Sequence, residues 1–237
     1  MEFPNTGFVS AIIVAGGSGR RFGGDIRKQY LELGGCSVLG RTLRLFMGIY
    51  EVGEVVVVAP KDDVAYIRGE LVPTELGSEL AKPLSVVAGG RTRQESARAG
   101  LAAADERFET VIIHDAVRPF AEPLHVSQVI QQAREHGGAI LAMHVKDTLK
   151  RGQAGFITGT TPRDGLYAAQ TPQAFSLAKL RDAHETAAKR GLTVTDDAAL
   201  FEALGYPVAI VEGSALNIKI TTEEDMAMAR AILGIRG

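Results

Sequence analysis

Short apolar runs alternate with amphipathic segments along most of this chain. The apolar runs suit strands that are buried on both faces of a sheet. They are Ala11–Val14, Val55–Ala59, Leu84–Ala88, Val111–Ile113, Ala139–Val145, Tyr167–Gln170, Val208–Val211 and Asn217–Ile220. Helices are expected at Val38–Phe46, Asp62–Glu70, Gln94–Ala104, Pro123–His136, Leu177–Lys189, Asp197–Leu204 and from the capping-box sequence Thr222–Asp225 onward. This alternation predicts an α/β fold with a doubly wound, mostly parallel, Rossmann-like sheet flanked by helices.

The alternation breaks between Lys146 and Thr161, where the sequence is polar and contains Gly152, Gly155 and Gly159. A disordered loop is one interpretation of this stretch. The short β-prone run at 156–158 favours a projecting β-hairpin, which we call the arm (about residues 146–161). The whole chain, residues 1–237, reads as one domain that includes this arm, because α/β chains of this length often fold as a single unit.

Composition narrows the class of protein. The chain has 237 residues, of which 46% are hydrophobic and 23% charged, and its formal net charge is −2. That balance gives no bulk attraction to nucleic acid or to an anionic membrane, so neither partner is expected. Cys36 is the only cysteine, which excludes an internal disulfide and suits a reducing compartment. Residues 1–10 lack a long apolar run, so we expect no signal peptide and a cytoplasmic protein.

A glycine-rich turn directly follows the first predicted strand. Gly16-Gly17-Ser18-Gly19 is followed by Arg20 and Arg21, and Lys28 comes soon after. Exposed backbone N–H groups beside three cations suit a polyphosphate, although the glycines alone could also form a plain surface turn. The Walker A pattern requires Lys after its last glycine. The dinucleotide fingerprint requires a glycine where Phe22 stands, which argues against a nicotinamide dehydrogenase.

Polar residues also follow other predicted strands, at the edge where ligands bind in open α/β sheets. They include 89–93, His114-Asp115 and Lys219. Asp115 is the best candidate for a Mg²⁺ ligand, because this ion is usually held by one or two carboxylates and substrate phosphates. Asp115 could instead cap the following segment. The pair Asp196-Asp197 reads as a helix start or as a catalytic pair, and the five histidines show no zinc-binding spacing.

Taken together, six motifs carry a family resemblance over nearly the whole chain. They are Ala15-Gly16-Gly17-Ser18-Gly19-Arg20-Arg21, Lys28-Gln29-Tyr30-Leu31, Gly89-Gly90 with Arg93 and Ser96, His114-Asp115-Ala116-Val117-Arg118-Pro119-Phe120, Gln170-Thr171-Pro172-Gln173 and Asn217-Ile218-Lys219-Ile220-Thr221. In this order and spacing they resemble the 2-C-methyl-D-erythritol 4-phosphate cytidylyltransferases of the non-mevalonate isoprenoid pathway. Ribitol-5-phosphate cytidylyltransferases are the main alternative, and a non-catalytic nucleotide-binding module is an alternative of another class. The segments 145–151 and 195–198 resemble the methylerythritol enzymes more.

The resemblance implies transfer of CMP from CTP to a polyol phosphate, with Mg²⁺, in a homodimer whose arm reaches the neighbouring site. It implies catalytic roles for Arg21, Lys28, Arg163 and Lys219. It implies that CTP is bound by Ala15, Gly16, Gly17, Gly90 and Ser96. It implies that the polyol phosphate is bound by Asp115, Arg118, Thr148 and Thr171, with Asp115 also as metal ligand.

The chain departs from the family pattern at two positions. Arg27 stands where the family usually has proline, so we expect the Lys28 segment to be less restrained by its backbone. Arg91 stands where an acid is common, which argues against a nucleotide contact from that side chain.

Overall fold

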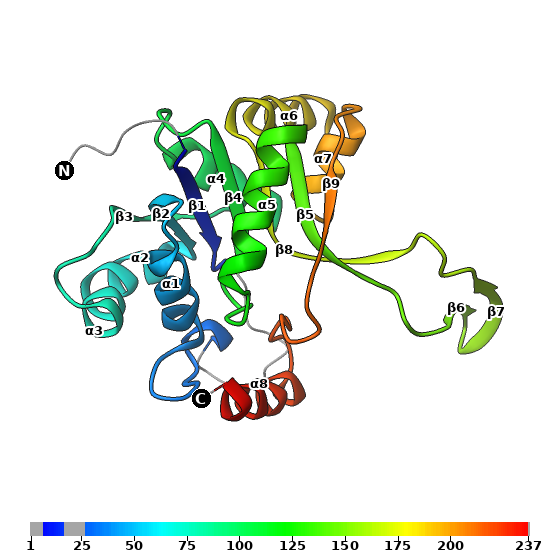
Figure 1. Ribbon diagram of the computed structural model, residues 1–237, viewed down its shortest axis with the longest axis horizontal. Helices are drawn as coiled ribbons and strands as arrows, with labels where there is room; N and C mark the ends of the chain where they lie inside the picture. Colours follow the sequence, from blue (N-terminus) through cyan, green and yellow to red (C-terminus); the bar gives the residue numbers. More distant parts are fainter. Residues whose placement is uncertain (1–6, 17–26, 237) are drawn as a thin grey trace.

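The computed structural model describes residues 7–16 and 27–236, which form a seven-stranded sheet beside a separate hairpin (Figure 1). The strand order is β3-β2-β1-β4-β8-β5-β9. The strands are β1 (Val9–Val14), β2 (Val52–Ala59), β3 (Leu84–Ala88), β4 (Thr110–Asp115), β5 (Gly138–His144), β8 (Tyr167–Ser176) and β9 (Ala209–Glu212). All neighbouring pairs are parallel except β4–β8 and β5–β8. The predicted mostly parallel α/β sheet is therefore confirmed, with one antiparallel strand inside it.

Helices cover both faces of this sheet, as the doubly wound prediction requires. One face carries α1 (Val38–Gly48) and α5 (Pro123–His136), and the other carries α4 (Arg93–Ala103), α6 (Leu177–Arg190) and α7 (Asp197–Ala203). Alternate strand residues supply the two cores: Ala11 and Ile13 pack in one, and Ile12 in the other. This alternation explains why the central strands read as continuous apolar runs.

Local sequence sets where the helices begin and end. Ser37 Oγ accepts a hydrogen bond from Gly40 N at 2.9 Å, and Thr92 Oγ1 accepts one from Glu95 N at 3.0 Å. These bonds satisfy free N–H groups in the first turns of α1 and α4. Gly137 closes α5 and Gly191 closes α6, with φ of 91° and 65° respectively, a left-handed conformation that side chains disfavour.

The last helix, α8 (Glu223–Arg236), packs beside the loops at one end of the sheet. Its start uses Asp225, whose Oδ2 accepts from Thr222 N at 2.9 Å while Asp225 N donates to Thr222 Oγ1 at 3.2 Å. This reciprocal pair confirms the predicted capping box, with aspartate as its acid.

Some boundaries differ from prediction. Residues 217–220 lie in the described part of the chain and form no strand there. They cross the end of the sheet, held by bonds from Ile220 N to Val117 O at 2.9 Å and from Arg118 Nη1 to Asn217 O at 2.7 Å. The buried Asn217 side chain fixes them further. The helix expected at 62–70 is instead a run of short helical segments: the 3-10 helix η3 (Lys61–Asp63), α2 (Val64–Tyr66), the π-helix η4 (Ile67–Leu71) and α3 (Val72–Leu76). Strand β8 runs six residues past the predicted end at Gln170, to Ser176.

The polar stretch after β5 forms the expected arm. Its strands β6 (Leu149–Gln153) and β7 (Phe156–Thr161) pair with each other and project away from the sheet (Figure 1). Phe156 and Ile157 are 78% and 70% exposed near its tip. Among the helices of residues 7–16 and 27–236, none combines the length and apolarity needed to cross a membrane.

Candidate active site

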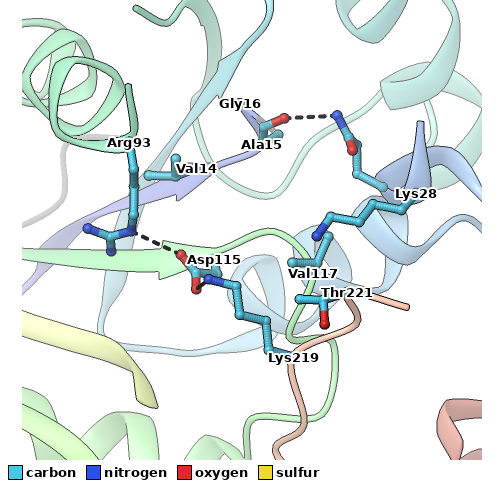
Figure 2. A pocket seen from close by; sticks show the side chains of 10 residues that line it. Val14, Ala15, Gly16, Lys28, Arg93, Asp115, Val117, Lys219 and Thr221 are labelled. Atoms are coloured by element: carbon cyan, nitrogen blue, oxygen red, sulfur yellow. Dashed lines mark hydrogen bonds and ion pairs between the residues drawn. The ribbon is translucent and has the colours of Figure 1, made fainter. Parts of the chain in front are cut away.

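A cavity of about 250 Å³ opens where β1 and β4 end side by side (Figure 2). Register pairs Val14 of β1 with Asp115 of β4, so the turn after β1 begins beside the Asp115 carboxylate. The chain crosses over in opposite directions from these two strands, which is the position where open α/β sheets bind ligands. The cavity is lined by Val14, Ala15, Gly16, Lys28, Gln29, Arg93, Asp115, Val117, Lys219 and Thr221.

Asp115 lies at the centre of this site and contacts cations from three segments. Its Oδ2 lies 2.7 Å from Lys219 Nζ, and its Oδ1 accepts from Arg93 Nε at 3.3 Å. Arg118 Nε lies 3.8 Å from Oδ2. The predicted site residues Asp115, Lys219 and Arg118 are thus brought together. Arg93 joins them at the Asp115 carboxylate (Figure 2).

These cations fix the charge of the carboxylate. Burial by itself would raise the pKa of Asp115, but Arg93, Lys219 and Arg118 outweigh it and hold that pKa well below its usual range. Burial lowers the pKa of Arg118, and the nearby carboxylate opposes that shift. The site therefore presents an ionised carboxylate with an excess of positive charge around it, which suits binding of phosphate groups.

The buried ring of His114 supports Asp115 through the Thr171 hydroxyl. Burial lowers the pKa of His114 to about 4, so its ring is neutral near pH 7. His114 Nε2 lies 3.0 Å from Arg118 O, which only accepts, so Nε2 carries the proton and Nδ1 accepts from Thr171 Oγ1 at 3.2 Å. Thr171 Oγ1 in turn accepts from Asp115 N at 3.1 Å. Thr171, predicted as a substrate contact, thus supports the backbone of the central carboxylate.

The segment that carries Lys28 is held by its neighbours. Gln29 is buried and donates from Nε2 to Ala15 O at 2.9 Å, which ties the segment to the end of β1. Asp63 pairs with Arg27, and its Oδ2 also accepts from Tyr30 Oη at 2.6 Å. Arg27 therefore supplies, through its side chain, a restraint in the position where the family usually has proline.

Two of the glycines proposed for nucleotide binding, Gly16 and Gly90, have little room for a side chain. A Cβ on Gly16 would lie 3.1 Å from Ser96 Oγ, and a Cβ on Gly90 would lie 2.3 Å from Glu95 Cβ. Ser96 is buried in the first turn of α4 and faces Gly16. Gly16 therefore lines the cavity and packs against Ser96, whereas Gly90 packs against Glu95, and neither Gly90 nor Ser96 is among the described residues that line the cavity. The backbones of Gly16 and Gly90 are exposed.

Other predicted residues lie elsewhere. Gly17 and Arg21 fall outside the described residues. Thr148 is exposed at the base of the arm, and Arg163 lies beside a separate hollow with His144, Lys146 and Gly165. Arg163 donates to Lys146 O. Within one copy of the chain, Thr148 and Arg163 are not among the described residues that line the central cavity.

Sequence reasoning missed several residues that shape this site. Gln29 and Thr221 line the cavity, and Asn217 supports it by donating from Nδ2 to Thr171 O at 2.9 Å. Their motifs gave a signal, because Gln29 follows Lys28 directly and Asn217 and Thr221 each lie two positions from Lys219. The contact of Arg93 with Asp115 is long-range, and no local pattern predicts it.

Comparison with known proteins agrees with this geometry. The family profile for IspD, 2-C-methyl-D-erythritol 4-phosphate cytidylyltransferase, matches residues 9–235. The chain is 44% identical over 227 residues to the 2-C-methyl-D-erythritol 4-phosphate cytidylyltransferase of Geotalea uraniireducens, covering 95% of this chain and 96% of that one.

Two solved structures share the fold over nearly their full length. The 4-diphosphocytidyl-2C-methyl-D-erythritol synthase of Anaerococcus prevotii superposes with a TM-score of 0.83 at 36% identity, covering 96% of each chain. The 2-C-methyl-D-erythritol 4-phosphate cytidylyltransferase of Thermus thermophilus gives 0.78 at 36% identity, covering 95% of this chain and 98% of that one. From the matched residues and these relatives, the chain belongs to the 2-C-methyl-D-erythritol 4-phosphate cytidylyltransferase family.

Proposed function

We propose that this chain transfers CMP from CTP to 2-C-methyl-D-erythritol 4-phosphate, giving 4-diphosphocytidyl-2-C-methyl-D-erythritol and pyrophosphate. The observation that carries this proposal is the set of three cationic side chains, Lys28, Arg93 and Lys219, around one cavity at the ends of β1 and β4. Family membership supplies the identity of the two substrates.

The chemistry requires charge neutralisation more than proton removal. The attacking group is a phosphate monoester whose second pKa is near 6, so it is largely ionised at neutral pH and needs no general base. Its oxygen attacks the α-phosphorus of CTP in line, the bond from that phosphorus to the bridging oxygen breaks, and pyrophosphate leaves. Two polyanions must approach each other for this step, so fixed cations that position and neutralise them supply the catalysis.

The roles of individual side chains follow the family resemblance. Arg21 and Lys28 stabilise charge at the α-phosphate. Lys219 and Arg163 hold the sugar phosphate, with contributions from Asp115, Arg118, Thr148 and Thr171. CTP is bound by Ala15, Gly16, Gly17, Gly90 and Ser96.

Mg²⁺ fits the donors present if substrate phosphates complete its coordination. Among the residues that the structure describes, no three His, Cys, Asp or Glu side chains cluster as a metal cage. Asp115 offers one ionised carboxylate at the cavity, and Mg²⁺ is commonly held by one carboxylate together with phosphates and water. Asp115 is thus the residue that would hold the ion, which would neutralise phosphate charge.

We also propose that the chain acts as one nucleotidyltransferase domain in a homodimer, with Thr148 and Arg163 serving the neighbour's site. The support is the placement of both residues on or beside the projecting arm. Mixed dimers of Arg21→Ala and Arg163→Ala subunits test this, because one intact site should form in each heterodimer. No recovery of activity in verified heterodimers would exclude donation between subunits.

A substrate panel tests the function. CTP and UTP are each combined with methylerythritol phosphate and with ribitol phosphate in the presence of Mg²⁺, and pyrophosphate release is measured as kcat/KM. The proposal expects the highest value for CTP with methylerythritol phosphate. A higher value for ribitol phosphate would identify the chain as a ribitol-5-phosphate cytidylyltransferase. CTP binding without turnover would indicate a non-catalytic nucleotide-binding module.

A further inference from the structure

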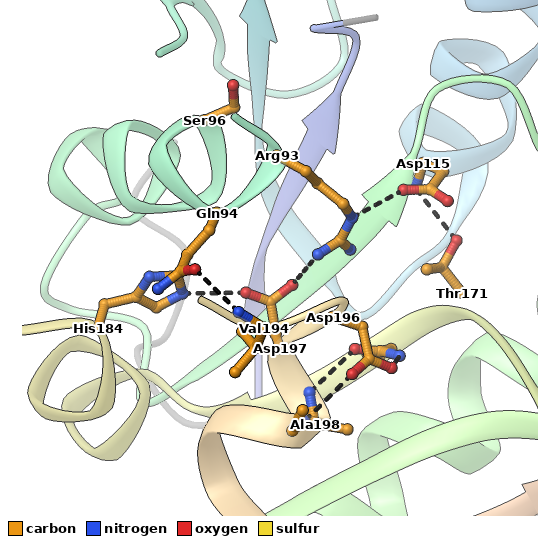
Figure 3. A network of polar contacts seen from close by, with 12 residues as sticks. Arg93, Gln94, Ser96, Asp115, Thr171, His184, Val194, Asp196, Asp197 and Ala198 are labelled. Carbon is orange, nitrogen blue, oxygen red and sulfur yellow. Dashed lines mark hydrogen bonds and ion pairs between the residues drawn. The ribbon is translucent and has the colours of Figure 1, made fainter. Parts of the chain in front are cut away.

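Arg93 links the central carboxylate to a second buried carboxylate, Asp197 (Figure 3). Arg93 Nη1 donates to Asp197 Oδ2 at 2.7 Å, whereas its Nε reaches Asp115 Oδ1 only at 3.3 Å. Its Nη2 is buried and has no hydrogen-bond partner among the described residues. The guanidinium therefore makes its closer contact with the carboxylate that lies outside the cavity.

Asp197 is itself fixed by His184 of α6. His184 Nε2 donates to Asp197 Oδ1 at 2.9 Å, and the two residues are 2% and 1% exposed. Burial by itself would raise the pKa of Asp197, but the bond from His184 and the charge of Arg93 outweigh it, so the carboxylate is ionised. Both oxygens of Asp197 are thus committed to partners in two other helices.

The adjacent acid, Asp196, supplies the cap at the helix start. Asp196 caps α7 by accepting from Ala199 N at 3.1 Å, and its Oδ2 accepts from Gln173 Nε2 at 2.8 Å. Asp197 is not needed for this cap. Burying an ionised carboxylate is costly without strong partners, so its partners Arg93 and His184 must offset that cost. The segment before α7 is also bonded to α4, through Gln94 Oε1 and Val194 N at 3.3 Å. This contact keeps Asp197 close to Arg93.

We propose that Asp197, oriented by His184, is a positioning residue that prevents Arg93 from closing on Asp115 and so leaves Asp115 Oδ2 to Lys219. An arginine beside a carboxylate favours a two-bond, fork-like contact. With Nη1 held by Asp197, Arg93 gives Asp115 one long bond, and Lys219 Nζ keeps its 2.7 Å contact with Oδ2. The ammonium group of Lys219 then stays at the cavity wall, where the sugar phosphate binds according to the proposed function, on which this inference rests.

The matched variants are Asp197→Asn and Asp196→Asn, which make the same chemical change at neighbouring positions. Asp197→Asn removes the charge that holds Arg93, so we expect KM for methylerythritol phosphate to rise about tenfold while the Kd for CTP, from calorimetry, changes less than twofold. Asp196→Asn keeps a good helix cap and leaves both values near wild type. Equal kinetics for the two variants, or losses for both substrates that follow the fall in Tm, would overturn the proposal.

A second pair of variants tests the role of His184. His184→Gln retains a donor close to the position of Nε2 and should restore most of the wild-type KM, whereas His184→Leu should resemble Asp197→Asn. If Asp197→Asn does not fold, Arg93→Lys provides the test, because a single ammonium group lacks the fork needed to reach both carboxylates. An unchanged KM for the sugar phosphate in Arg93→Lys would overturn the proposal.

Crystal structures separate this inference from the proposed function, because they do not depend on turnover. In Asp197→Asn, Arg93 should approach Asp115 with both Nε and Nη2, and Lys219 should leave Oδ2. An Arg93 side chain that stays in place would refute the positioning role even in an active enzyme. Wild-type protein without transferase activity would instead refute the proposed function.

Discussion

Removal of Asp63 should weaken catalysis although this residue does not line the cavity. Asp63 accepts from Tyr30 Oη at 2.6 Å and pairs with Arg27, so it holds the residues on both sides of the Lys28–Gln29 pair. In Asp63→Ala these two bonds are lost while Gln29 keeps its bond to Ala15 O. Lys28 should then occupy its working position for a smaller fraction of the time.

The size of the effect follows from the two bonds. A hydrogen bond to a charged group contributes about 1.5–3 kcal/mol. The ion pair with Arg27 contributes about 0–1 kcal/mol, because the side chains of Arg27 and Asp63 are 33% and 16% exposed and solvent screens them. A loss of about 2 kcal/mol in the preference for the working position lowers kcat/KM about thirtyfold.

The assay is steady-state pyrophosphate release, with Asp62→Ala as the matched control. Asp62 is an exposed carboxylate on the same short helix, and its removal should change kcat/KM less than twofold. Equal kinetics for the two variants would refute the reasoning.

A rescue variant adds a second check. The backbone at Arg27 has φ of −66° and ψ of 138°, which proline adopts without strain. Adding Arg27→Pro to Asp63→Ala should therefore recover about tenfold of the lost activity, since proline restrains the backbone without a side-chain partner. No recovery in the double variant, at unchanged Tm, would show that the side-chain contacts of Arg27 do something other than restrain the backbone.

Three further predictions follow from the site and the arm. Lys28→Ala should lower kcat by about 10²–10³, the scale of one fixed charge-stabilising donor, and an intact kcat with a raised KM would remove Lys28 from that role. The pKa of buried His114 is lowered to about 4, so the unfolded chain binds the extra proton first as pH falls below about 6.5. The free energy of unfolding should therefore fall by about 3 kcal/mol between pH 6.5 and 4 through this group, and urea titrations of His114→Asn should lack that part of the slope. Phe156→Glu with Ile157→Glu should shift sedimentation toward monomer and reduce activity, whereas a monomeric wild type would exclude the arm as a dimer contact.

The sequence predicted the fold well because its strands are short, β-branched and bounded by turn residues. The limits of β3 and α5 agree with prediction at both ends, since Gly89, Pro123 and Gly137 mark their boundaries. The segment 217–220 was predicted wrongly because Ile218 and Ile220 alternate with polar residues as in a strand. Its pattern reflects packing against α8 and burial of Asn217, which are tertiary contacts.

The site was predicted in part. Ala15, Gly16, Lys28, Asp115 and Lys219 line one cavity, as the motif positions at strand ends implied. The buried contacts behind them join residues about one hundred positions apart in sequence, and no local periodicity reports such pairs. The roles of the predicted residues in catalysis stay predictions, since they depend on bound substrates.

The antiparallel strand β8 limits how this protein can change in length. β8 runs from Tyr167, at the base of the arm, past Thr171 to Ser176 in the sheet, and its register with β5 shifts between Ala169 and Gln173. Inserting one residue between Tyr167 and Ala169, where β8 pairs with β5 in regular register, would turn the side chains on one side of the insertion to the opposite face and disturb the neighbouring Thr171. Insertions at the turn 154–155 would leave this register intact. Natural variation and engineered fusions should therefore be tolerated at the tip of the hairpin and rejected at its base.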